Sequence, residues 1–291
     1  MTSRIETLSG PHEERFYTKT WTPVDGPKAA VCFLHGFNEH IGRYDHVFDK
    51  YAEEGLAVFA FDQRGFGKTG QKTHGVTSWQ HQLEDISWAI EHTARIFPTV
   101  PLFLMGHSMA GALVIAYATR QPASPHLDKL AGVVSSAPLL RQAAGARTHM
   151  LIVKLGSIVG KLSSKLTVAT PLNPDHVCRD PEISKAYAQD PLCEQKGTFK
   201  HVADMLLGGE ALVTKDYKHW PAKLPLLVIH GSADKITDHD SSKEIVDKLQ
   251  KEGKPVDFKS LDGLYHEPHN EPGEDRWNAI AVVTDWIKAK L

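Results

Sequence analysis

The stretch P-L-F-L-M-G-H-S-M-A-G, from Pro101 to Gly111, decides the fold of this chain. An apolar run ends at Gly106. His107 and Ser108 follow, and the sequence A-L-V-I-A-Y-A-T-R after them is typical of a helix. This order predicts a strand, a sharp turn and a helix, with glycine at 106 because a side chain there would collide with backbone. The turn exposes the Ser108 hydroxyl beside the next N–H group and the positive end of a helix dipole. The stretch therefore predicts a nucleophilic serine.

Short apolar runs alternate with helix-like segments along most of the chain. The predicted buried strands are residues 29–34, 56–61, 101–105, 132–137, 226–229 and 256–261. The predicted helices are residues 44–54, 79–97, 111–120, 241–252 and 275–288, and E-R-F-Y-T-K-T-W-T near the N-terminus alternates like an edge strand. Nearly continuous apolar strands are typical of a parallel sheet that is covered on both faces. The alternation predicts an α/β protein with a doubly wound sheet.

One region interrupts this alternation, because no clear buried strand is found between about Leu139 and Pro221. It includes L-I-V-K-L-G-S-I-V-G-K-L, in which apolar residues and lysines share an amphipathic stretch. An insertion at this point predicts a helical cap over the carboxyl ends of the strands, where ligands bind in open α/β sheets. The expected organisation is a core of residues 1–138 and 222–291, with residues 139–221 as the cap.

The composition of the chain limits the classes of protein to which it can belong. The chain has 291 residues, 41% of them hydrophobic, and a formal net charge of −2. No long basic run is present, which argues against nucleic acid as a partner. Three cysteines without paired spacing favour a reduced, cytoplasmic protein over a secreted one, and no signal-like or membrane-spanning apolar run is found.

A nucleophilic serine needs a base, and the base needs an acid that orients it. In the fold built around such a turn, the chain order is serine, acid, histidine. Asp234 follows the strand in L-L-V-I-H-G-S-A-D, and His266 follows the last strand in F-K-S-L-D-G-L-Y-H-E-P-H. His269 is a rival for the base, whereas Asp238 and Asp240 lie further along and are expected to be surface or cap residues.

The same chemistry needs N–H donors for an oxyanion. One is the N–H of Met109, the residue after the nucleophile, and the other comes from the loop after an early strand. That loop begins with His35 and Gly36, which predicts the backbone N–H of Phe37 as the second donor.

With these motifs assembled, the chain resembles the monoacylglycerol lipase family of the α/β-hydrolase superfamily over essentially its whole length. The matching motifs are H-G-x-x-E-H-x-G-R-Y at 35–44, F-D-Q-R-G-F-G-K-T at 61–69, G-H-S-M at 106–109, D-P-L at 190–192, H-G-S-A-D at 230–234 and Y-H-x-x-H at 265–269. The first and last motifs are specific to the family. The resemblance implies an α/β-hydrolase fold with a helical cap, and hydrolysis of monoacylglycerols to fatty acid and glycerol without a metal or cofactor.

Carried over position by position, the resemblance implies Ser108, Asp234 and His266 as the catalytic triad and Phe37 and Met109 as the oxyanion donors. It also implies a polar cluster that binds the glycerol hydroxyls: Glu39, Arg43, Tyr187 and His269. The alternative for Glu39 and Arg43, which are four residues apart, is an ordinary structural ion pair.

Ala110 departs from the family pattern G-H-S-M-G-G, which has glycine at this position. Alanine favours helix over glycine by roughly 1 kcal/mol, so it stabilises the turn if its methyl group fits. This departure puts in question the exact position of Ser108, and hence the rate of the reaction.

Two functional alternatives stay open: a broader carboxylesterase or lysophospholipase with the same triad, and a non-catalytic hydrolase-fold protein that binds an apolar ligand. The amphipathic segment around 151–162 predicts transient contact of the cap with a membrane or lipid-droplet surface. The alternative is that its apolar side covers an apolar tunnel for the acyl chain, which the resemblance implies beneath the cap.

Overall fold

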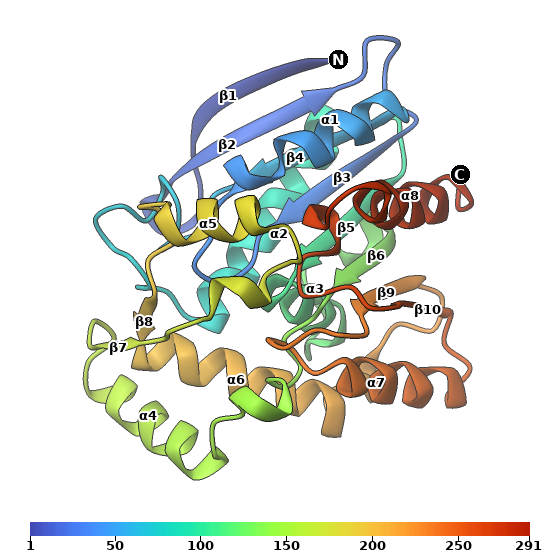
Figure 1. Cartoon of the computed structure of the whole chain (residues 1–291). Helices are drawn as coiled ribbons and strands as arrows, with labels where there is room; N and C mark the ends of the chain where they lie inside the picture. The colour runs from blue at the N-terminus through green and yellow to red at the C-terminus, as the bar shows by residue number, and fades with distance from the viewer.

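The computed structural model describes all of residues 1–291 and is built around one eight-stranded sheet (Figure 1). The strand order is β1-β2-β4-β3-β5-β6-β9-β10. The strands are β1 (Thr2–Ser9), β2 (Arg15–Thr22), β3 (Ala29–Leu34), β4 (Leu56–Phe61), β5 (Leu102–His107), β6 (Leu130–Ser136), β9 (Leu226–Gly231) and β10 (Val256–Leu261). From β4 to β10 all neighbours are parallel, whereas β1 and β2 add antiparallel strands at one edge. The predicted α/β fold with a mostly parallel sheet is confirmed.

Helices cover both faces of the sheet. They are α1 (Asp45–Glu53), α2 (Trp79–Ile96), α3 (Met109–Thr119), α7 (His239–Lys251) and α8 (Glu274–Lys288). Residues of α2, α3 and α7 pack in a core of 37 buried residues on one face, and residues of α1 and α8 pack in a second core of 20 on the other. Because β3, β4, β5 and β9 lie between the two cores, all of their residues are buried. This double covering explains their continuous apolar sequences.

The chain between β6 and β9 forms a largely helical insertion. It contains α4 (Met150–Leu162), α5 (Pro181–Gln189) and α6 (Phe199–Thr214), with the short antiparallel pair β7 (Thr167–Ala169) and β8 (Lys196–Thr198). Helix α6 packs against α2, α3 and α7, and α4 packs on α6, so that α4 lies outermost (Figure 1). None of the helices combines the length and the apolar character that a bilayer-crossing segment requires.

The strand β1 was not among the predicted elements. Its sequence T-S-R-I-E-T-L-S is mostly exposed and polar, although it pairs with β2 along its whole length. An edge strand whose side chains are solvated lacks the apolar pattern that identifies buried strands. Pairing with β2 therefore decides its conformation.

Candidate active site

Ser108 lies in the turn between β5 and α3 with a φ of 56°, in the left-handed region. The turn is held by backbone hydrogen bonds, since the Ser108 N–H donates to Ser136 O (2.8 Å) and its own carbonyl accepts from Leu139 N (2.9 Å). A Cβ atom at Gly106 would lie 2.2 Å from the Ala110 carbonyl oxygen, which confirms the expected need for glycine there. Ala110 itself is fully buried within the larger core, so its methyl group fits beneath the turn.

The structure brings Ser108, His266 and Asp234 into one hydrogen-bonded chain. His266 Nε2 lies 2.9 Å from Ser108 Oγ, and His266 Nδ1 lies 2.7 Å from Asp234 Oδ2. Asp234 is fixed at the end of β9, where its Oδ1 accepts from the N–H groups of Ile236 (2.7 Å) and Thr237 (3.0 Å). This arrangement leaves one edge of the imidazole facing the serine and the other facing the acid.

Burial and neighbouring charges act in opposite directions on the pKa values of Asp234 and His266. Burial alone would raise the pKa of Asp234, but the facing His266 ring and a hydrogen bond from His230 hold it well below its usual range. Burial alone would lower the pKa of His266, and the Asp234 carboxylate outweighs burial and raises it. The ionised carboxylate favours the tautomer with the proton on Nδ1, which leaves Nε2 free to accept the proton of Ser108.

The loop after β3 lies against Ser108, because a Cβ atom at Gly36 would be 3.0 Å from Ser108 Cβ. The buried His35 ring holds this loop, with Nδ1 2.7 Å from Gly36 O and Nε2 accepting from Gln63 N (2.8 Å). Burial lowers the pKa of His35 to about 3, so the ring stays neutral. Phe37 follows Gly36 on the cavity wall.

Met109 is the first residue of α3. Its N–H is therefore one of those that an α-helix leaves without a partner inside the helix. Phe37 and Met109, whose N–H groups are the predicted oxyanion donors, thus follow directly after Gly36 in the β3 loop and after Ser108 at the start of α3.

A buried ionic cluster lies beside this site. Arg43 donates through Nη1 to Glu39 Oε2 (2.8 Å) and through both Nη atoms to the carboxylate of Glu267 (2.6 and 2.8 Å). Tyr44 donates to Glu39 Oε1 (2.8 Å), and the Arg43 guanidinium lies over the Tyr187 ring, 4.8 Å from its centroid. All three charged side chains are less than 10% exposed.

Glu267 is a member of this cluster that the sequence did not predict. Although burial opposes its ionisation, the charge of Arg43 and the two hydrogen bonds from its guanidinium lower the pKa of Glu267 to about 2. The one available signal was its position next to His266, which places the carboxylate on the same loop as the predicted base. Nothing in the sequence indicated that it would face Arg43, 224 positions earlier in the chain.

His269 does not join the cluster on the cavity wall. The 3₁₀ turn Pro268–Asn270 directs its ring between Tyr44 and His107, with ring centroids 4.8 and 5.0 Å away, and burial lowers its pKa to about 3. His266, and not His269, is the histidine that contacts Ser108.

A cavity of about 550 Å³ opens above Ser108. Its wall is apolar at α4 and α6, with Val153 and Val159 from α4 and Leu206 from α6, and polar at Glu39, Arg43 and Tyr187. Two groups of side chains have metal-binding donor sets: His40, Asp190 and Cys193, and His12, His81 and Glu84. None of these six residues lines the cavity.

Comparison with known proteins identifies the family. Residues 25–273 match the family described as serine aminopeptidase, S33. The chain is 33% identical to the monoacylglycerol lipase of Mycolicibacterium smegmatis over 98% of this chain and 97% of that protein, and 27% identical to mouse monoglyceride lipase, with 94% and 87% covered. Among solved structures, Paleococcus ferrophilus monoacylglycerol lipase superposes with a TM-score of 0.79 at 29% identity, covering 95% of this chain and 99% of that one. A soluble variant of Saccharomyces cerevisiae monoglyceride lipase, in complex with a substrate analogue, shares the fold with a TM-score of 0.88 at 22% identity, covering 99% and 94%. The chain belongs to the monoacylglycerol lipase family of serine hydrolases with the α/β-hydrolase fold.

Proposed function

We propose that this protein hydrolyses monoacylglycerols to a fatty acid and glycerol through an acyl-enzyme on Ser108. The observation that carries the proposal is the His266 ring, which bridges Ser108 Oγ and Asp234 Oδ2 at the base of a cavity. The names of its relatives support the substrate class, because monoglyceride and monoacylglycerol lipases are among them.

The mechanism follows from the positions of these groups. His266 Nε2 takes the proton of Ser108 as Oγ attacks the ester carbonyl, and the Asp234 carboxylate stabilises the imidazolium that forms. The N–H groups of Phe37 and Met109 stabilise the oxyanion of the tetrahedral intermediate. The imidazolium then returns the proton to the departing glycerol oxygen. Water, deprotonated by His266, attacks the acyl-enzyme, and the proton passes to Ser108 Oγ as the fatty acid leaves.

We assign the two ends of the cavity to the two parts of the substrate. The apolar wall from α4 and α6 suits an acyl chain, so we propose residues 139–221 as a cap that covers it. Glu39, Arg43 and Tyr187 form the polar end, which suits the glycerol hydroxyls. Glu267 orients Arg43 within that end, and His269 packs behind it.

The substrate proposal predicts a preference for glycerol esters over simple esters. We expect kcat/KM for 1-monooleoylglycerol to exceed that for methyl oleate by at least about tenfold, the effect of one or two well-placed hydrogen bonds. Tyr187→Phe removes one hydroxyl from the polar end and is expected to reduce this preference severalfold without lowering turnover of methyl oleate.

Tyr265→Phe is the matched control, since Tyr265 does not line the cavity and its hydroxyl accepts one hydrogen bond, from Lys235 Nζ at 3.4 Å. Equal kcat/KM for the two esters in the wild type would contradict the glycerol assignment and favour a general carboxylesterase or lysophospholipase. A phospholipase, YtpA of Bacillus subtilis, is among the relatives, at 27% identity over 91% of this chain and 98% of that protein. If no ester were hydrolysed, the remaining interpretation would be a non-catalytic protein that binds an apolar ligand.

We further propose that α4 contacts a membrane or lipid-droplet surface, where such substrates reside, while the protein is otherwise cytoplasmic. Large apolar side chains on this helix are strongly exposed: Leu151 (64%), Ile152 (61%), Leu155 (62%), Ile158 (57%) and Leu162 (83%). Lys154 and Lys161 lie on the same helix. Exposed apolar residues beside lysines are typical of helices that lie in an anionic interface.

Liposome co-sedimentation tests this contact. We expect binding to vesicles that contain anionic lipid, and a loss of about tenfold or more in the double variant Lys154→Glu/Lys161→Glu, because each lysine near such a surface contributes about 1 kcal/mol. Lys243→Glu/Lys251→Glu, on α7, is the matched charge reversal and should bind like the wild type. Unchanged binding of the α4 variant would indicate that α4 serves only to cover the cavity.

A further inference from the structure

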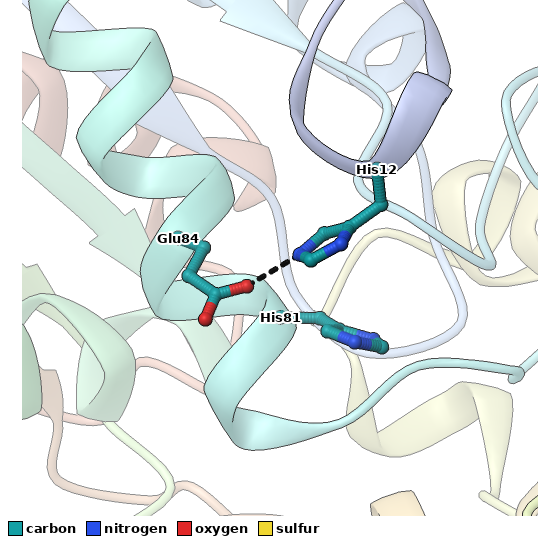
Figure 2. A group of neighbouring side chains, drawn as sticks. All are labelled: His12, His81 and Glu84. Atoms are coloured by element: carbon teal, nitrogen blue, oxygen red, sulfur yellow. Dashed lines mark hydrogen bonds and ion pairs between the residues drawn. The ribbon is translucent and has the colours of Figure 1, made fainter.

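We propose that His12, His81 and Glu84 form a binding site for a divalent transition metal, with Zn²⁺ the best match, that fastens the turn between β1 and β2 to helix α2. Figure 2 shows His81 and Glu84 on the same helix and His12 reaching them from a separate turn. The donor atoms of the three side chains all lie within 4.8 Å of one another. None of the three lines the cavity, so the site is independent of the proposed hydrolase function.

The turn that carries His12 is built to present it to α2. His12 and Glu13 have φ angles of 54° and 59°, a left-handed conformation that non-glycine residues adopt at a cost. The turn is closed by Gly10 N, which donates to Glu14 O (2.9 Å), and Arg64 Nη2 donates to Pro11 O (2.9 Å). These contacts hold the backbone so that the His12 ring meets the helix.

The two proposed ligands on helix α2 are oriented as well. His81 and Glu84, three positions apart, lie on one face of the first turns of α2. Gln80 Nε2 donates to Glu84 Oε1 (2.5 Å), which leaves Oε2 directed at His12 Nε2, 2.6 Å away. The His12 and His81 rings lie side by side, with centroids 4.8 Å apart. A hydrogen bond to the far oxygen of a carboxylate ligand is the kind of outer contact that orients metal ligands.

The donor set matches zinc chemistry. Two imidazoles and one carboxylate are ligands that Zn²⁺ takes in three-residue sites, with water in the fourth position. Tetrahedral bonds of about 2.0–2.1 Å place ligand atoms about 3.3 Å apart, between the 2.6 Å contact of His12 with Glu84 and the outer limit of 4.8 Å. Small side-chain rotations therefore suffice. The His12 side chain is 51% exposed and that of Glu84 is 34% exposed, which leaves the site open to solvent.

Zinc titration of the untagged, chelator-treated protein tests the proposal, with calorimetry and Tm as readouts. We expect one metal per chain, a rise in Tm with Zn²⁺, and visible absorption of a tetrahedral Co²⁺ complex. His81→Ala keeps the pair between His12 and Glu84 but removes the third ligand. We expect it to weaken Zn²⁺ binding by about tenfold or more and to remove the Tm rise. Glu84→Gln, which changes only the charge and one oxygen, should do the same.

The matched control is His126→Ala. His126 and Glu91 form a pair at the other end of α2, 3.9 Å apart, without a third ligand. This variant should bind Zn²⁺ like the wild type, and ester hydrolysis should be unchanged in every variant of this set. Absence of binding to the wild type would overturn the site. Binding that survives both His81→Ala and Glu84→Gln would also overturn it, and would point to His40, Asp190 and Cys193 instead.

Discussion

Replacement of Ser108 by alanine is expected to lower kcat for ester hydrolysis by at least about 10⁴-fold and to abolish covalent labelling by a fluorophosphonate. The reason is that the Ser108 Oγ atom, 2.9 Å from His266 Nε2, supplies both the attacking atom and the proton that His266 accepts. Without it, the oxyanion donors and the cavity remain, but no acyl-enzyme forms. Fatty-acid release from monooleoylglycerol and probe labelling measure the two effects separately.

Ser124→Ala is a suitable control for this variant. Ser124 is also buried, but its hydroxyl donates only to Tyr117 O (2.7 Å), away from the site. We expect it to retain activity and labelling. Turnover of monooleoylglycerol that persists in Ser108→Ala would contradict the proposed nucleophile, and labelling of that variant would indicate another reactive side chain.

Replacement of Arg43 by methionine is expected to destabilise the fold by about 3–5 kcal/mol, because it leaves Glu39 and Glu267 buried without their shared cation. For a chain of 291 residues, that loss corresponds to a fall in Tm of roughly 5–8 °C. Thermal and urea unfolding measure it. Without a cation, two adjacent buried carboxylates have lost their hydration and repel each other, unless one of them takes up a proton.

Two further variants test whether the loss of stability comes from the buried carboxylates or from removal of an arginine as such. Arg141 also bridges two glutamates, Glu210 and Glu244, but its side chain is 21% exposed and theirs are more so. We expect Arg141→Met to cost less than about 1 kcal/mol. Adding Glu39→Gln and Glu267→Gln to Arg43→Met should recover part of the stability, since the buried charges are then gone. A Tm of Arg43→Met close to that of the wild type would refute the buried-pair account.

The alternation of strands and helices was predictable because each parallel strand of the core is covered on both faces. Burial of both faces makes a strand apolar throughout, and that pattern is visible in residues 29–34 and 56–61 without any knowledge of their neighbours. The strands β1, β7 and β8 escaped prediction for the converse reason. The residues of β1 and β7 are largely exposed, and β8 has only three residues, so pairing partners rather than local sequence hold these strands in place.

The polar cluster shows a second kind of limit. Glu39 and Arg43 are four residues apart, so their pairing was visible as an alternative in the sequence. The bidentate contact of Arg43 with Glu267 joins positions 224 residues apart and has no local signature. His269, expected among the glycerol-binding residues, does not line the cavity, because the 3₁₀ turn Pro268–Asn270 places its ring against Tyr44. The side-chain directions in a loop depend on the whole fold.

The sequence by itself determined the family, the mostly parallel sheet, and the loops that carry Ser108, Asp234 and His266, because hydrophobic period and turn chemistry are local properties of the chain. Only the tertiary structure decided that His266, and not His269, reaches Ser108, that Glu267 completes the buried charge cluster, and that His12 meets His81 and Glu84. These contacts join segments far apart in the chain. Their distances follow from how the sheet and its covering helices pack, which no short stretch of sequence encodes.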